Sequence, residues 1–311
     1  MRIFTGLAAI PPQSRPAVVT VGVFDGVHRA HQRLIHSTVR LARRVHGVSV
    51  VVTFEPDPQV VLDPTHASPA LMPLDARLDA LRALGVDWVV VIPFTRGFAE
   101  MPAETFVRRI VEGRLRAAAL IVGESFAFGR DRQGNMATLR ALAPALGIRV
   151  MAVRDVRSGR TPISSSRIRR LIAGGRLADA KRLLGRPPAL YGTVVRGAGR
   201  GRRLGFPTVN IHLRASTVPP RGVYAVRLVT GARGYRGVMN FGVRPTFGAG
   251  PLVCEVHLLD VTASLRKRQV AVYLHRRLRS ERCFPSPEAL VRQVRRDVRR
   301  ARRVLAKIAL H

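Results

Sequence analysis

Cysteine is scarce in this chain of 311 residues, occurring only as Cys254 and Cys283. Two cysteines make neither a disulfide framework nor a zinc site. Long hydrophobic runs are also missing, because the apolar segments at 48–54 and 88–94 have the length of a strand and fall far short of a membrane span. The first residues, MRIFTGLAAIPPQ, contain one short apolar run broken by two prolines, unlike a signal peptide. We therefore expect a soluble cytoplasmic protein with no membrane partner.

Acidic residues and lysine are scarce as well. The chain carries 53 Lys and Arg against 19 Asp and Glu, for a formal net charge of +34, and lysine occurs only at positions 181, 267 and 307. Such an excess of arginine predicts polyanionic partners: nucleic acid, an acidic membrane surface or phosphorylated substrates. The arginines are spread along the whole chain, which instead favours a surface where arginine has generally replaced lysine, without any partner. The sequence has no recognition-helix or RRM signature, so a nucleic-acid-binding protein is the weaker alternative.

Hydrophobic residues make up 47% of the chain, enough for two domains of ordinary size. In the first half, segments that are apolar throughout alternate with segments of helical periodicity, as in a parallel sheet covered by helices on both faces. In such a sheet, ligands bind at the carboxyl ends of the strands. We predict strands at 18–24, 48–54, 88–94, 118–123 and 148–153, with helices at 28–46, 74–84, 103–115 and 135–146.

The pattern changes near residue 185, where a glycine and two prolines end the last helix of the first half. Short strand candidates separated by Gly- and Pro-rich turns follow, which is typical of an antiparallel barrel or sandwich. They lie at 190–195, 207–213, 222–229, 236–241, 252–259 and 270–274. We therefore predict two domains, at 1–186 and 187–311.

A helix predicted at 287–308 closes the second domain. Its apolar positions form a stripe that is expected to pack on the barrel, and the arginines at 292, 295, 296, 299, 300 and 303 fall on the other side, as a basic outer face. The stripe consists of Val291, Val294, Val298, Ala301, Leu305 and Ala309.

The first predicted strand runs into the sequence GVFDGVHRAH, residues 22–31. Its glycines let a nucleotide approach the backbone closely, and the N-terminus of the next helix offers N–H groups to phosphates. His28 and His31 lie three residues apart, so they share a helix face and can both donate to phosphate oxygens. Such donors stabilise the charge on a phosphoryl group under attack. Taken alone, a polar turn with two exposed histidines explains the segment equally well.

A second segment, ISSSRIR at 163–169, follows a strand and opens a helix. Its serines can cap the helix while their hydroxyls reach a phosphate, and its arginines can pair with phosphate oxygens in bidentate fashion. Alone it is a good N-cap. Together, the two segments have the order and spacing of a nucleotidyltransferase, with an HxGH-like motif after the first strand and an ISSTxxR-like motif before the last helix.

The second half contains its own candidate site. The basic loop GRGRRLGFP, residues 199–207, enters a strand, and its N–H groups can cradle phosphates. Thr208 and Asn210 lie two apart on that strand, so both side chains point the same way and offer oxygen ligands suited to Mg²⁺. Glu255, on a later strand, can take a proton from an attacking hydroxyl. The alternatives are an ordinary barrel strand and a solvated carboxylate.

The chain as a whole resembles the bacterial bifunctional riboflavin kinase/FMN adenylyltransferases, also called FAD synthetases. Several independent motifs in the same order carry the resemblance, and they cover essentially the whole chain. They are TVGVFDGVHRAHQRLI (20–35), TFEPDP (53–58), VGESFAFG (122–129), ISSSRIR (163–169), GRGRRLGFPTVN (199–210), NFGVRPTF (240–247), CEVHLLD (254–260) and LRSERCF (278–284).

This resemblance implies a nucleotidyltransferase-like Rossmann domain that makes FAD and pyrophosphate from FMN and ATP. A small antiparallel β-barrel riboflavin kinase domain with a C-terminal helix follows it and makes FMN from riboflavin and ATP. Riboflavin, FMN, FAD and ATP are the implied partners, and Mg²⁺ is the implied cofactor.

The resemblance also implies a role for each motif residue. In the first domain, His28 and His31 would contact the phosphates. The nucleotide pocket would be shaped by Gly22, Phe24, Asp25 and Gly26. The triphosphate would be held by Ser164, Ser165, Ser166 and Arg169, with help from Arg167. In the second, Gly201 and Arg202 belong to the nucleotide loop, Thr208 and Asn210 ligate Mg²⁺, and Glu255 is the catalytic base.

Three positions depart from the family's usual motifs. Ala30 stands where glycine is usual, Asp57 replaces a histidine, and Ser125 replaces an acid or amide. The change at Asp57 exchanges a possible phosphate donor for an acceptor with negative charge. These departures favour one alternative function, a riboflavin kinase whose adenylyltransferase domain is weakened or inactive.

Overall fold

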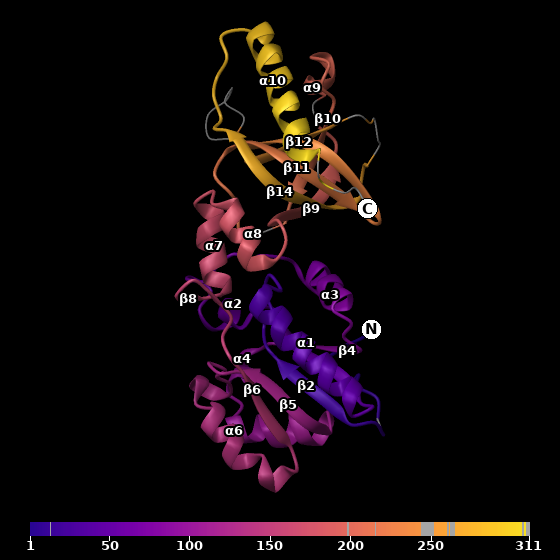
Figure 1. The fold of residues 1–311 in the computed structure, drawn as a ribbon, viewed down its shortest axis with the longest axis vertical. Helices are drawn as coiled ribbons and strands as arrows, with labels where there is room; N and C mark the ends of the chain where they lie inside the picture. The colour runs from indigo at the N-terminus through magenta and orange to yellow at the C-terminus, as the bar shows by residue number, and fades with distance from the viewer. Residues whose placement is uncertain are drawn as a thin grey trace. The chain divides into compact units, whose positions relative to one another are not determined.

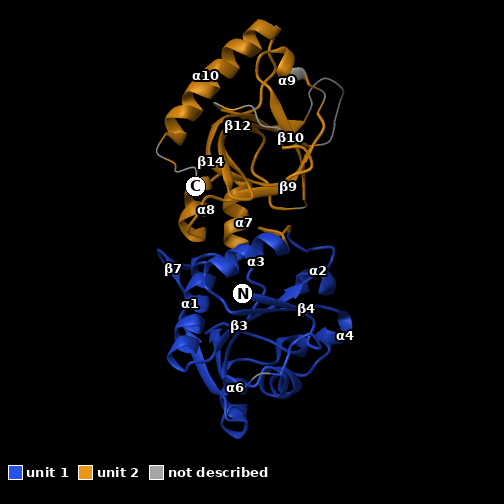
Figure 2. Cartoon of the chain, turned by 90° about the vertical axis from the view of Figure 1, so that its right-hand side faces the viewer, with its two compact units in different colours: residues 1–68, 74–165 blue, residues 69–73, 166–311 orange. Residues whose placement is uncertain are grey.

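Two compact units make up the chain (Figures 1 and 2). Unit 1 is residues 1–68 and 74–165, and unit 2 is residues 69–73 and 166–311. The computed structural model describes residues 1–12, 14–197, 199–214, 216–243, 252–259, 261, 265–306 and 308. Residues 244–247 of the NFGVRPTF segment and Asp260 of the CEVHLLD segment lie outside the described residues. In the part that the structure describes, every helix is too short or too polar to span a bilayer.

A six-stranded parallel sheet forms the centre of unit 1, which confirms the predicted α/β domain. The strands lie in the order β1-β4-β3-β2-β5-β6, and each neighbouring pair is parallel. The chain builds outward from β2 on one side and then returns to β5 on the other, so the ligand crevice is expected between β2 and β5. Their bounds are β1 (Arg2–Thr5), β2 (Ala17–Val21), β3 (Val48–Glu55), β4 (Trp88–Pro93), β5 (Ala117–Gly123) and β6 (Arg149–Val153).

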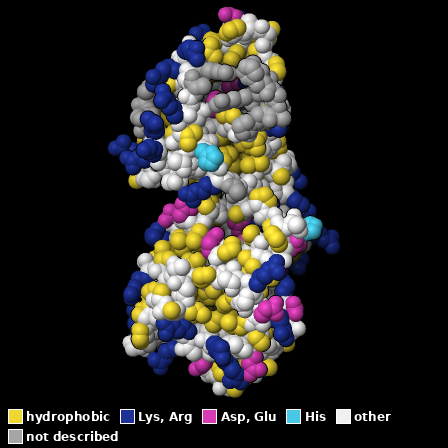
Figure 3. Space-filling view, turned by 180° about the vertical axis from the view of Figure 1, so that it is seen from behind, with side chains coloured by type: hydrophobic (Ala, Val, Ile, Leu, Met, Phe, Trp, Pro, Cys, Tyr) yellow, Lys and Arg dark blue, Asp and Glu magenta, His cyan; other side chains and the backbone are white. Residues whose placement is uncertain are grey.

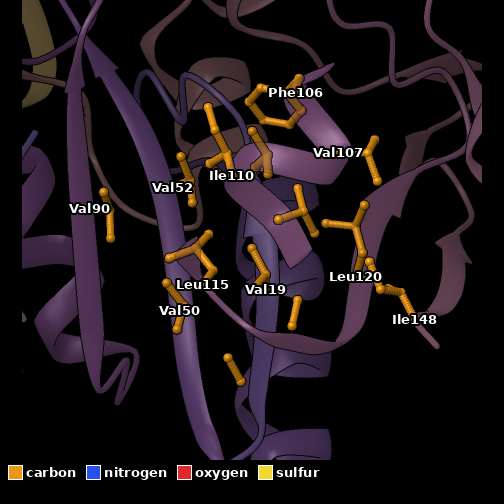
Figure 4. Close-up of a cluster of buried hydrophobic side chains, with 14 of the residues drawn as sticks. Val19, Val50, Val52, Val90, Phe106, Val107, Ile110, Leu115, Leu120 and Ile148 are labelled. Atoms are coloured by element: carbon orange, nitrogen blue, oxygen red, sulfur yellow. The ribbon is translucent and has the colours of Figure 1, made fainter. Parts of the chain in front are cut away.

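Helices cover this sheet, which is why its valine-rich strands are buried. On one face the strand valines pack against Phe106, Ile110 and Leu115 in the cluster of Figure 4, and α1 contacts β2 and β3. The helices are α1 (Arg29–Arg44), α2 (Pro58–Leu62), α3 (Leu74–Ala83), α4 (Arg96–Ala99), α5 (Ala103–Phe106), the π-helix η1 (Val107–Arg114), the 3-10 helices η2 (Arg130–Arg132) and η3 (Pro144–Leu146), and α6 (Met136–Leu142). A small hairpin, β7 (Arg157–Ser158) and β8 (Thr161–Pro162), follows β6.

Two local predictions for unit 1 differ from the structure, and the first strand was not predicted. The strand predicted at 18–24 ends at Val21, and the backbone leaves the extended region with a positive φ at Phe24. The helix predicted at 103–115 is a turn of α-helix followed by a π-helix, in which the Leu115 N–H bonds the Ile110 carbonyl five residues earlier. The edge strand β1 was not predicted, since its four residues carry too little pattern to be distinguished from a loop.

A closed antiparallel barrel forms the centre of unit 2, and this too confirms the prediction. The strands follow one another around the barrel as β10-β13-β12-β11-β14-β9. Alternate residues point inward, so that Ile211, Met239, Phe241 and Val256 belong to its core. The bounds are β9 (Ala189–Val195), β10 (Thr208–Leu213), β11 (Gly222–Thr230), β12 (Arg233–Val243), β13 (Leu252–Leu258) and β14 (Gln269–Arg279), with helices α7 (Ser165–Ala173), α8 (Leu177–Leu184) and α9 (Arg200–Arg203).

The closing helix α10 (Pro287–Leu305) packs on the outside of β11, β12 and β14. Its six arginines named above are largely solvent-facing, as predicted. Of the predicted apolar stripe, Val298, Ala301 and Leu305 pack against the barrel, and Ala309 lies outside the described residues. The buried face also includes Gln293 and Asp297, which were not part of the prediction. Asp297, 1% exposed, accepts from Arg279 at 2.8 Å and from the Gln293 amide at 2.8 Å. A polar network from the end of β14 therefore replaces apolar packing in the first half of the helix.

One short segment of the first half belongs to the second unit. Residues 69–73 group with the barrel rather than with their chain neighbours. Thr217 donates from its N–H to Ala70 O at 2.9 Å and from its hydroxyl to Pro69 O at 3.0 Å. Arg169 donates to Pro69 O at 2.9 Å. The division at residue 186 stays a prediction, and by contacts α7 and α8 group with the barrel.

Candidate active sites

The loop Gly22–His28 joins β2 to α1 through a strained backbone. Phe24 and Val27 have φ angles of +55° and +39°, which are unfavourable for these side chains. Both are 1% exposed, so burial of their side chains holds the conformation in place. Asp25 and His28 are also buried, at 5% and 3% exposure. Strain of this kind gathers at functional sites, where the surrounding structure fixes it.

His28 and His31 lie against each other at the start of α1. Their rings stack with centroids 3.5 Å apart and 19° between the planes, and the Phe24 ring meets His31 edge-on at 5.2 Å. His28 is the N-cap, and its Nδ1 accepts from the His31 N–H at 3.3 Å, which places the proton of a neutral His28 on Nε2. Burial, and then the His28 imidazole, hold the pKa of His31 well below its ordinary value of 6.5. His31 is therefore neutral at pH 7, and its Nδ1 is buried without a hydrogen-bond partner among the described residues.

The ISSSRIR segment runs from unit 1 into unit 2. Ser165 is the first residue of α7, and its hydroxyl donates to Asp25 O at 2.9 Å, which ties the start of α7 to the Gly22–His28 loop. Ser164 and Ser166 are exposed, while Arg167 and Arg169 are partly buried. The structure thus connects the two predicted motifs within unit 1 through one serine hydroxyl.

A large cavity, of about 840 Å³, opens in unit 1 where β2, β3, β4 and β5 end. Its wall is mostly apolar, and hydrophobic side chains gather over unit 1 on the face drawn in Figure 3 (lower half of the view). Among the lining residues are Gly22 and Val23 of the loop, and six aromatic side chains: Phe54, Phe94, Phe98, Phe106, Phe126 and Phe128. This aromatic wall was not predicted. Two of the motifs named above contribute to it, TFEPDP through Phe54 and VGESFAFG through Phe126 and Phe128.

Two of the three departures from the family pattern lie on the cavity wall. Asp57 and Ser125 line it, whereas Ala30 is in the first turn of α1. Asp57 also has a local structural role, since its carboxylate caps α2 by accepting from the Gln59 N–H at 2.9 Å.

Polar side chains form a row across three barrel strands in unit 2. Asn210 on β10 stands directly opposite Glu255 on β13, and Glu255 stands opposite Asn240 on β12. Directly opposed residues of antiparallel strands share a face, and the neighbours Ile211, Val256 and Met239 occupy the barrel interior. The row therefore lies on the outside of the barrel. Asn240 was not among the predicted site residues, because only the strand register shows its position.

The basic loop at residues 199–207, together with Gly197 just before it, lies against this row. A Cβ placed on Gly201 would stand 2.4 Å from Phe206 O and 3.3 Å from the Thr208 hydroxyl, and one on Gly197 would overlap the Asn210 amide. Only glycine permits these approaches. His257, opposite Thr208 on β13, meets the Phe206 ring edge-on and bonds Pro207 O through Nδ1 at 2.8 Å. The loop, Thr208, Asn210 and Glu255 are thus brought together, while Arg202 is exposed to solvent.

The donors in this second site fit a magnesium ion shared with a nucleotide. Among the described residues, no group of three or more His, Cys, Asp or Glu side chains could hold a metal by itself. A threonine hydroxyl, an amide oxygen and a carboxylate are instead the hard oxygen donors that Mg²⁺ accepts alongside phosphate oxygens. Cys254, beside Glu255 in sequence, is a core residue whose pKa is raised to about 12 by burial and by the Glu255 charge.

Both halves of the chain match known family models. The model for FAD synthetase matches residues 10–167, and the model for riboflavin kinase matches residues 184–305. A bifunctional riboflavin kinase/FMN adenylyltransferase of Escherichia coli is 37% identical, with 92% of this chain and 91% of the relative covered. The protein of that name from Pseudomonas fluorescens is 37% identical, with 99% of both covered.

One solved structure covers nearly the whole fold. A crystal structure described as a macrolide-efflux protein from Streptococcus pneumoniae superposes with a TM-score of 0.86 and 29% identity over 97% of this chain and 99% of that chain. With two family models in order and two relatives matched along almost their full length, the chain belongs to the family of bifunctional riboflavin kinase/FMN adenylyltransferases.

Proposed function

We propose that the loop site of unit 1 and the outer row of unit 2 carry the family's two reactions in sequence. Unit 2 phosphorylates riboflavin to FMN, and unit 1 joins FMN to the adenylyl group of a second ATP to form FAD. The observation that supports this most strongly is the presence, on one chain, of the stacked His28–His31 pair and of Glu255 directly opposite Asn210. The cytoplasm, where ATP is abundant, is the expected location, and the two unpaired cysteines accord with it.

In the adenylyltransferase site of unit 1, His28 and His31 act as hydrogen-bond donors. A phosphate oxygen of FMN attacks the α-phosphorus of ATP, the new P–O bond forms, and the bond to the β-phosphate oxygen breaks to release pyrophosphate. His28, through Nε2–H, and His31 stabilise the charge on the α-phosphoryl oxygens. Asp25, Gly26, Gly22 and Phe24 shape the nucleotide pocket, and Ser164 and Ser165, which belong to the same unit, hold the triphosphate.

The cavity in unit 1 is the proposed binding site of the flavin ring. Isoalloxazine is flat and aromatic, so the phenylalanine-rich wall suits it by offering rings for stacking and edge contacts. Val23 of the Gly22–His28 loop lines the same cavity. A flavin ring bound there would therefore bring the phosphate of FMN toward the histidines at the end of that loop.

In the kinase site of unit 2, Glu255 takes the proton of the terminal ribityl hydroxyl of riboflavin. The hydroxyl oxygen bonds to the γ-phosphorus of ATP, and the bond to the β-phosphate oxygen breaks, leaving FMN and ADP. Thr208 and Asn210 would hold Mg²⁺, which when bound neutralises charge on the ATP phosphates. Gly201 and Arg202 position the phosphates through backbone N–H groups and positive charge.

Separate substitutions test the assignment of the two sites. Glu255→Gln is expected to abolish conversion of riboflavin to FMN while leaving conversion of FMN to FAD, and His28→Ala is expected to do the reverse. The products are separated by chromatography after incubation with ATP and Mg²⁺. If either substitution reduced both activities equally in a folded protein, the two-site assignment would be wrong.

A riboflavin kinase with a weakened adenylyltransferase is the second candidate. Asp57 favours it, because a carboxylate on the cavity wall repels an anionic flavin nucleotide. The same product assay decides between the two candidates: accumulation of FMN without FAD would establish the second.

A further inference from the structure

Arg77 is a buried arginine that no sequence motif marks. It lies on α3 and is 4% exposed. Its guanidinium donates from Nη1 to Val23 O at 2.7 Å, and from Nη2 to Phe54 O at 3.2 Å and to the Glu55 carboxylate at 2.5 Å. Its Nε is buried without a hydrogen-bond partner among the described residues. Charged side chains are rarely buried to this extent unless they are paired with other groups.

The acceptors of Arg77 belong to two segments that serve the same site. Val23 is in the Gly22–His28 loop, directly before the strained Phe24, and its carbonyl also accepts from the Thr53 hydroxyl at 3.0 Å. Phe54 is at the end of β3. Both Val23 and Phe54 line the large cavity of unit 1. One guanidinium therefore joins the histidine-bearing loop to the end of the neighbouring strand β3, and both places line the cavity.

The arrangement is better suited to fixing geometry than to supplying stability. Glu55, the carboxylate that pairs with Arg77, has a side chain that is 47% exposed, so the charge interaction does little to offset the desolvation of the guanidinium. A planar fork with several N–H donors can reach two carbonyls in fixed directions, whereas a lysine ammonium cannot reproduce that geometry. The backbone that it holds contains a phenylalanine at a positive φ, which relaxes unless it is held.

We propose that Arg77 is a positioning residue for adenylyl transfer. It keeps the Gly22–His28 loop at a fixed place relative to the carboxyl end of β3, so that the histidines and the flavin-binding wall face the same reacting phosphate. Arg77 acts through the loop and does not touch the substrates. This inference rests on the proposed role of His28.

The test compares Arg77→Met with Arg77→Lys in the full chain. For FMN-to-FAD conversion, we expect kcat to fall roughly 100-fold in Arg77→Met, since a displacement of about 1 Å at a catalytic group has an effect of that order. The KM for FMN and for ATP should change much less. Arg77→Lys should recover part of kcat. Riboflavin phosphorylation by the same protein samples should be unchanged, because that site belongs to unit 2. Arg82→Met, an exposed position on the same helix, is the matched control and should have no effect.

A double variant tests whether Arg77 acts through the histidine. If it does, Arg77→Met combined with His28→Ala should be no slower than His28→Ala alone, because residues acting as a unit are not additive. An additive double variant, a raised KM with unchanged kcat, or an equal loss of both activities would overturn the inference. If His28→Ala itself left FAD formation intact, the proposed function would fail first. If Arg77→Met does not fold, the kcat and KM of Arg77→Lys decide by the same criteria.

Discussion

Replacing Gly201 by alanine should disable the kinase reaction and leave the adenylyltransferase reaction intact. A Cβ at this position would stand 2.4 Å from Phe206 O, a backbone atom that cannot rotate away, whereas ordinary contacts begin near 3.4 Å. The loop must therefore shift by about 1 Å, and Thr208, whose hydroxyl would be 3.3 Å from the new methyl, is in the path of that shift. A misplacement of this size costs roughly 100-fold in rate, or about 2.7 kcal/mol of transition-state stabilisation.

The same loop offers a matched control. Gly199 has a φ of +71°, but among the described residues no atom lies within 4 Å of the position that a Cβ would take, so Gly199→Ala adds backbone strain of about 1 kcal/mol without a clash. FMN formation from riboflavin should fall roughly 100-fold in Gly201→Ala and only a few-fold in Gly199→Ala. FAD formation from supplied FMN, measured on the same preparations, serves as an internal standard for active protein. Full kinase activity in Gly201→Ala, or equal losses in the two glycine variants, would refute the reasoning from close approach.

Two further predictions concern stability. The pKa of His31 in the folded protein is depressed below its ordinary 6.5, so below that pH the unfolded chain binds a proton that the folded one does not. Unit 1 should therefore lose stability as the pH falls below about 6.5, by up to about 1.4 kcal/mol per pH unit. Chemical denaturation between pH 7.5 and 5.5 measures this slope, and a slope unchanged in His31→Gln would contradict its assignment to that group. Asp297→Ala should destabilise unit 2 by about 3 kcal/mol, because it leaves the Arg279 guanidinium without its buried partner. Urea unfolding tests this, and Asp297→Asn, which keeps an acceptor, should lose less.

The parts of the fold that sequence predicts well are those set by local pattern. The valine runs of β3 and β4 and the alternation along β10 are complete within a few residues, so their strands fall where the pattern indicates. The stacked histidines follow from a spacing of three on a helix. In the same way, Thr208 and Asn210 share a face because they lie two apart on a strand.

The parts that sequence does not predict depend on partners far along the chain. Val23, inside the strand predicted at 18–24, lies instead in a loop, where its carbonyl accepts from Thr53 and Arg77, which lie 30 and 54 residues away. Asp297 is buried on α10 because Arg279 meets it from β14. Asn240 joins Glu255 and Asn210 only through strand register. Periodicity within a window carries no information on such contacts.

The assignment of residues 69–73 to the barrel unit bears on how separable the two enzymes are. A gene that encoded only the second half would lack the carbonyls of Pro69 and Ala70, and Thr217, 9% exposed, would lose both of its hydrogen bonds to them. The barrel unit thus includes a short segment, residues 69–73, that lies within the sequence of the first half of the chain. A kinase fragment cut at the predicted boundary therefore needs residues 69–73 supplied from elsewhere to keep these two hydrogen bonds.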